Sequence, residues 1–149
     1  MAIYARADWS NRDTVTARSQ MQEEEKDWSL VRLKWAVQAL ALPANEQRDL
    51  FPSFVLVGDE LALDFYECRE IALKDHALTD DQLAALESLD ATLSKMTAEN
   101  NMELWEEPGV DHPRWEEVRN NAKDALKRLG WSMDTPPKDR AIYVGPPGR

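Results

Sequence analysis

The stretch TDDQLAALESLDATLSKM, residues 79–96, decides the fold. Thr79 and Gln82 are spaced as a capping box, in which two side chains satisfy free N–H groups of the first helical turn. Large apolar residues then recur every three or four positions, which is the period of one helix face. This buried stripe is Leu83, Leu86, Leu89, Leu93 and Met96. The stretch therefore predicts a helix with one face in a core.

Helices are also predicted on both sides of this stretch. The preceding one should begin with Asp59 as its N-cap and reach about Lys74. Its buried stripe is Leu61, Phe65, Cys68 and Ala72. The following helix should have Asp111 or His112 as its cap and Pro113 at its first position, and Gly130 should close it. Its apolar face is Trp115, Val118, Ala122, Ala125, Leu126 and Leu129.

A further helix should run from about Trp28 to Leu42 and end at Pro43, because proline disfavours helical geometry at the preceding residue. It has two apolar stripes. One is Leu30, Leu33, Val37, Leu40 and Ala41, and the other is Trp28, Val31, Trp35 and Leu42. The second stripe either packs against a neighbouring helix or forms a docking surface.

The segments between and outside these helices are less regular. Residues 42–47 look like a helix stop and a short capped turn, and residues 51–57 form an apolar connector against the core, as an extended link or a short strand. We expect an all-α fold, a single-domain bundle of about four main helices over residues 1–149. It has an irregular arm (1–27), a helical core (28–131) and a tail (132–149). Residues 141–144 form a short docked strand or a partner-binding peptide.

Composition narrows the setting of the protein. The single Cys68 excludes an internal disulfide and falls on an apolar face, which favours a buried thiol in a reducing compartment. No long apolar run or signal-like start is present, so we expect a cytoplasmic protein with no membrane partner. No phosphate-binding glycine loop or nucleophile motif occurs. Neither His76 nor His112 has a second histidine three or four positions away, which is the spacing of a helical metal site. No cofactor and no catalytic residue are predicted.

Charge is the second informative feature. The net charge is −10, and residues 59–112 hold fifteen acidic residues against three basic ones, whereas residues 113–149 hold five acidic and eight basic. Such an acidic segment repels phosphate backbones and attracts cations, so direct nucleic-acid binding is disfavoured. The segment is either a solvated face or a surface for a basic partner.

The candidate binding site lies in the long acidic loop predicted for residues 97–112. Trp105 is surrounded there by carboxylates, and an aromatic anchor ringed by acids suits a basic protein. The predicted partner-binding residues are Glu103, Trp105, Glu106, Glu107 and Asp111. We expect a non-enzymatic acidic protein-binding module, such as an inhibitor. In general character it is similar to bacteriocin-immunity and other toxin-neutralising proteins.

Two other functions follow from other residues. The pattern Glu67-x-x-Glu70 followed by Glu87-x-x-Asp90 resembles the paired carboxylate motifs of all-α nucleotide pyrophosphohydrolases. That resemblance implies a Mg²⁺-dependent hydrolase that uses these four acids as ligands. The helical periodicity, however, turns them toward water and away from the bundle interior. The other alternative is a self-assembling structural subunit, a homo-oligomer that buries the stripe containing Trp28 and Trp35.

Overall fold

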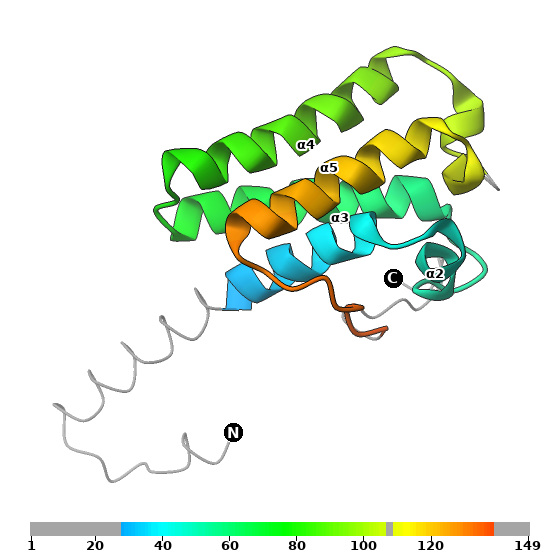
Figure 1. Cartoon of the computed structure of the whole chain (residues 1–149). Helices are drawn as coiled ribbons and strands as arrows, with labels where there is room; N and C mark the ends of the chain where they lie inside the picture. The colour runs from blue at the N-terminus through cyan, green and yellow to red at the C-terminus, as the bar shows by residue number, and fades with distance from the viewer. Residues whose placement is uncertain (1–27, 107–108, 139–149) are drawn as a thin grey trace, which may run out of the picture.

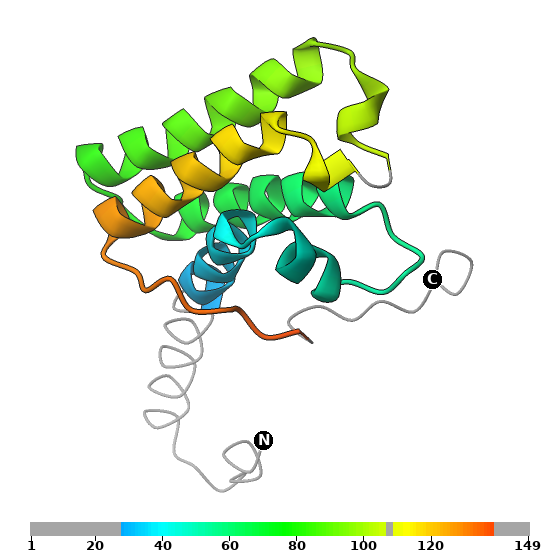
Figure 2. The same cartoon turned by 45° about the vertical axis from the view of Figure 1, so that its right-hand side comes forward.

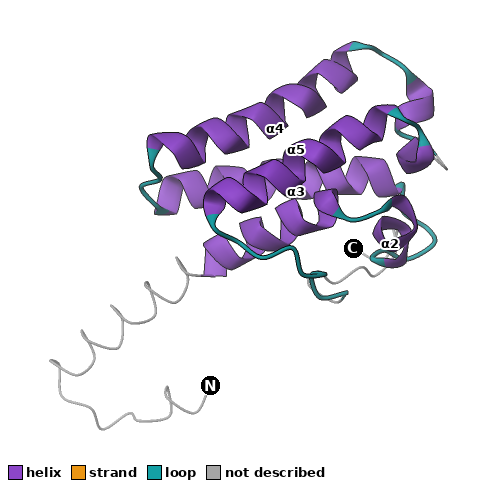
Figure 3. Cartoon of the chain, in the orientation of Figure 1, coloured by secondary structure: helices purple, strands orange, loops and turns teal. Residues whose placement is uncertain are grey.

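The structure is a computed structural model that describes residues 28–106 and 109–138. All regular structure in this part of the chain is helical, with no strand (Figure 3). Its long helices are residues 28–41, here called the first helix, α3 (Val57–Asp75), α4 (Asp80–Ala98) and α5 (Arg114–Leu129). The shorter ones are α2 (Ala44–Asp49) and the 3₁₀ turns η2 (Met102–Leu104) and η3 (Gly109–Asp111). The predicted all-α bundle of four main helices is confirmed.

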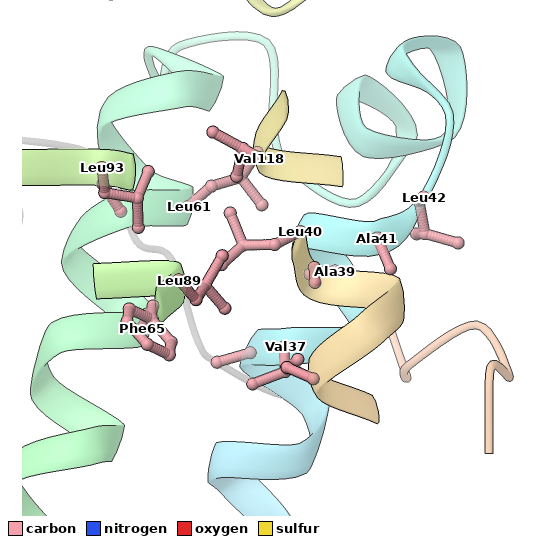
Figure 4. Packing of buried hydrophobic residues seen from close by; sticks show 14 of the residues in the cluster. Val37, Ala39, Leu40, Ala41, Leu42, Leu61, Phe65, Leu89, Leu93 and Val118 are labelled. Atoms are coloured by element: carbon pink, nitrogen blue, oxygen red, sulfur yellow. The ribbon is translucent and has the colours of Figure 1, made fainter. Parts of the chain in front are cut away.

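The four long helices surround one core. α4 and α5 run side by side in opposite directions, and the loop between them closes one end of the bundle (Figure 1). The first helix and α3 complete the bundle, so that Val37 and Leu40 meet Phe65, Leu89 and Val118 in the interior (Figure 4). This arrangement buries every predicted apolar position of α5.

The helix ends that the sequence marks most clearly are present. The backbone N–H of Gln82 donates to Thr79 Oγ1 over 3.1 Å, and the N–H of Thr79 donates to Gln82 Oε1 over 2.9 Å. The capping box at the start of α4 is therefore confirmed. At the end of α5, Gly130 adopts a φ of 75°, a left-handed conformation that glycine tolerates best.

Three predicted boundaries need correction. α3 begins at Val57, before the predicted cap Asp59, because Val57 and Gly58 are buried against the rest of the fold. Residues 44–49 form the helix α2 and not only a turn, because their Gln47 is anchored in the core. At the start of α5, Pro113 is the N-cap and Asp111 lies in η3, while His112 Nδ1 accepts a hydrogen bond from the N–H of Arg114.

The apolar connector between α2 and α3 is irregular. Residues 51–56 form a loop and no strand, with Phe51 buried and Phe54 exposed. Trp131 folds back onto the core. The predicted arm (1–27) and the predicted strand or peptide at 141–144 lie outside the described residues. Among the helices of the described part, none is long and apolar enough to cross a membrane.

Candidate functional site

The acidic loop, residues 99–111, connects α4 to α5 and lies beside α2 and the start of α3 (Figure 2). Trp115, which is fully buried on α5, anchors the centre of the loop from the core side. The indole Nε1 of Trp115 donates a hydrogen bond of 2.8 Å to the carbonyl oxygen of Leu104. The rings of Trp105 and Trp115 meet edge to face, with centroids 5.5 Å apart. The middle of the loop is thus fixed to the core.

Both ends of the acidic loop are held by arginines. Arg114 binds the carboxylate of Glu99, with 3.0 Å between Arg114 Nε and Glu99 Oε2. That hydrogen bond lowers the pKa of Glu99 from its usual value. Arg48 Nη1 lies 2.5 Å from Asp111 Oδ1, and Arg119 Nη1 donates to the carbonyl of Val110 over 3.1 Å. The loop is therefore cross-linked to α2 and α5.

The predicted binding residues have different environments within this loop. Glu103 and Glu106 are exposed. Trp105 is only partly accessible, because one side of its ring rests on Trp115 and the core. Asp111 is exposed but is paired with Arg48, and Glu107 lies outside the described residues. The two carboxylates at 103 and 106 are thus available to a partner, with Trp105 partly buried between them.

A buried polar network behind the loop is absent from the sequence predictions. Gln47 is completely buried, and its Nε2 donates to the carbonyls of Ala39 and Leu40 over 3.1 Å each. Its Oε1 accepts a hydrogen bond of 2.9 Å from Arg119 Nη1. The one sequence signal is the place of Arg119, four residues after Trp115 and beside Val118 on the apolar face of α5. This network links α2 to α5 underneath the loop.

The four acids of the hydrolase alternative do not converge. Glu67, Glu70 and Glu87 are exposed, and Asp90 is partly buried. Within residues 28–106 and 109–138, no three His, Cys, Asp or Glu side chains are grouped so that they could hold a metal ion. These carboxylates therefore form separate surface positions.

Cys68 is buried, with 3% of its surface exposed, at the contact between α3 and the first helix. Its Sγ lies 3.7 Å from Asp64 Oδ1. Burial, with the nearby negative charge of Asp64, raises the pKa of Cys68 from 9.0 to about 12. The thiolate, which is the nucleophilic form, is thus scarce at neutral pH.

A shallow groove lies between the first helix and α3. It has a volume of about 220 Å³ and is lined by Trp28, Ser29, Arg32, Cys68, Ile71 and Asp75. The exposed Trp28 meets Trp35 edge to face, with ring centroids 5.0 Å apart. The groove is smaller than the roughly 300 Å³ at which small-molecule sites begin. Its size is better suited to a single side chain of a partner.

In comparisons with known proteins, no protein-family model, curated protein or solved structure matches this chain.

Proposed function

We propose that this protein is a non-enzymatic binding module for a basic protein, with a role of the kind that an inhibitor or immunity-type protein has. The observation that carries the proposal is the anchoring of the described parts of the acidic loop, residues 99–106 and 109–111, to α2 and α5. Glu103 and Glu106 stand exposed on a segment that Trp115, Arg114 and Arg48 hold in place. Binding groups that are already ordered lose less entropy on association than groups on a loose loop.

The charge balance supports the same function. The cations that form ion pairs in the described residues are all arginines, namely Arg48, Arg114, Arg119 and Arg128. Each is held by acids of this same chain, whereas Glu103 and Glu106 take part in none of these pairs. The excess negative charge attracts a basic surface and increases its association rate at low salt. The excess negative charge also disfavours direct binding of nucleic acids. We further propose that the protein works in a reducing cytoplasm, where the single Cys68 stays a free thiol.

The test is the association rate with the basic protein that this chain retains from its native cell extract. Glu103→Lys/Glu106→Lys should lower the association rate about tenfold or more at low salt, because two attractions become repulsions. The matched control is Asp80→Lys/Glu87→Lys, which changes the net charge equally at exposed sites in the first half of α4, away from the loop. At about 0.1 M salt it should slow association much less than the loop variant, since charges farther from the interface than a Debye length of about 10 Å are screened.

An unchanged association rate for the loop variant at low salt would contradict the proposed site. Equal slowing by the loop variant and its control would mean that only the overall charge matters. Failure to retain any basic protein from the extract would contradict the binding function itself.

A further inference from the structure

The outward face of α3 and its N-cap carries three exposed apolar residues, which we call the α3 strip: Leu56, Leu63 and Ile71, with Asp59 between the first two and Glu67 and Glu70 between the last two. Leu56 is the N-cap of α3, and the side chains of Leu56, Leu63 and Ile71 are 46%, 46% and 45% exposed. Leu63 and Ile71 are about two turns apart and lie along one side of the helix, and Leu56 lies just before its first turn. At 1.5 Å per residue the strip is about 22 Å long.

This pattern differs from an ordinary solvent face. A helix on the surface of a bundle normally turns charged and polar residues outward, whereas α3 has large apolar residues on its inner and outer faces. Its inner face supplies Leu61, Phe65 and Ala72 to the core. The strip is therefore apolar surface beyond what the fold uses. Its end at Ile71 borders the groove that Trp28 lines on the other side.

The charges on the α3 strip select among possible occupants. Glu67 lies one turn from both Leu63 and Ile71, and Glu70 is also exposed. Neither glutamate takes part in an ion pair within the described residues. Lys74, three positions after Ile71, is the basic residue on this side of α3. A second copy of α3 would set glutamates against glutamates, which is unfavourable, whereas a cationic helix would neutralise them.

We propose that the α3 strip binds an amphipathic, cationic helix of the partner protein. Apolar residues of that helix lie against Leu63 and Ile71, and one enters the groove beside Trp28. Its lysines or arginines face Glu67 and Glu70. This is the helix-in-groove mode of recognition, in which anchors repeat every three, four and seven residues. The inference rests on the proposed function, since it names the element of the basic partner that is recognised, but it uses a surface other than the acidic loop.

The direct test uses the full-length protein and a synthetic 14-residue helical peptide of leucine and lysine, with leucines at the i, i+3, i+4 and i+7 positions. The chain has isoleucine only at positions 3, 71 and 142, so labelling the δ1 methyl group of isoleucine gives three NMR signals. The Ile71 methyl signal should shift and saturate as the peptide is added. Glu67→Lys/Glu70→Lys should weaken peptide binding about tenfold, and Leu63→Ser should weaken it about threefold.

Two matched controls distinguish binding at the α3 strip from effects of net charge and of exposed apolar surface in general. Glu46→Lys/Asp49→Lys reverses two exposed acids on α2, and Met102→Ser removes an exposed apolar side chain outside α3. Both should leave peptide affinity within about twofold of the unaltered protein. The substituted positions are all at the surface, where most replacements alter stability little.

Several results would overturn the inference. These are equal weakening by the strip variant and the α2 control variant, binding that leaves the Ile71 signal unmoved, and no binding of the peptide. A concentration-dependent shift of Ile71 without peptide would show that a second copy occupies the strip. Weakening by the loop variant alone would also overturn it, but would leave the proposed function intact.

Discussion

Arg119 and Gln47 are joined inside the molecule by a hydrogen bond of 2.9 Å from Arg119 Nη1 to Gln47 Oε1. They are 72 positions apart in the sequence, and both are buried. Because a buried guanidinium is costly unless its donors find acceptors, this contact fixes α2 against α5.

The first prediction concerns this contact. Gln47→Leu should reduce the free energy of unfolding by about 2–4 kcal/mol, since it removes an acceptor from Arg119 and donors from two backbone carbonyls. Urea unfolding measures the change. The control Asn45→Leu, at an exposed position of α2, should alter stability by less than about 0.5 kcal/mol. Equal stabilities of the two variants would contradict the role assigned to Gln47.

The second prediction concerns the anchoring of the acidic loop. Trp115→Phe should lower the free energy of unfolding by about 1–3 kcal/mol, because the carbonyl of Leu104 loses its donor in the interior. The backbone N–H of Glu106, bonded to the Met102 carbonyl, should exchange with solvent faster. Trp28→Phe, at a half-exposed position, should do neither. Unchanged exchange at Glu106 in Trp115→Phe would show that the loop is held by other contacts.

The third prediction tests the close approach of α3 to α5. A Cβ at Gly58 would lie 2.7 Å from Cζ2 of Trp115 and 3.2 Å from the carbonyl oxygen of Leu104. Alanine normally stabilises a helix by about 1 kcal/mol relative to glycine. Gly58→Ala should nevertheless destabilise this protein by about 1–3 kcal/mol, because the contact is overpacked. In a double-mutant cycle, Trp115→Phe should relieve part of that loss, and strict additivity would contradict the clash.

The fourth prediction concerns Cys68, whose pKa is raised by burial to about 12. Its alkylation at pH 8 should be more than a hundredfold slower than that of a free thiol and should reach the normal rate on unfolding. In the unfolded state the thiol has a pKa near 9.0, so as pH rises it ionises before the buried thiol does, and this ionisation stabilises the unfolded state. The unaltered protein should therefore lose more stability than Cys68→Ala between pH 9 and pH 12, whereas parallel pH profiles would count against it.

The fifth prediction concerns Glu99, whose pKa is lowered by the hydrogen bond from Arg114. Its contribution to stability is present above its usual pKa of 4.5 and is lost as pH falls through the lower value in the folded protein. NMR titration of Glu99 should show this low midpoint. Arg114→Gln should raise it toward 4.5, and Lys95→Gln should raise it less. Equal effects of the two variants would mean that general positive charge lowers the pKa.

The candidate site was only partly predictable from the sequence. The exposed Glu103 and Glu106 follow from composition and loop length alone. The partial burial of Trp105 does not, because it depends on Trp115, which belongs to another helix. The pairing of Asp111 with Arg48 joins residues 63 positions apart and leaves no local pattern. The exposed apolar row on α3 could have been found from Leu56, Leu63 and Ile71, but the inner stripe of the same helix dominates the periodicity.

The sequence by itself determined the helices whose evidence is local. The capping box at Thr79, the leucine stripe of α4 and the Gly130 stop depend on residues within a few positions of one another, where backbone geometry fixes the contacts. Tertiary structure alone decided the early start of α3, the helix α2 and the anchoring of the acidic loop at Leu104. Each depends on a contact with another element, namely Gly58 with Trp115, Gln47 with Arg119 and Leu104 with Trp115. Such contacts form only when packing brings distant segments together, because burial makes each unpaired polar group costly.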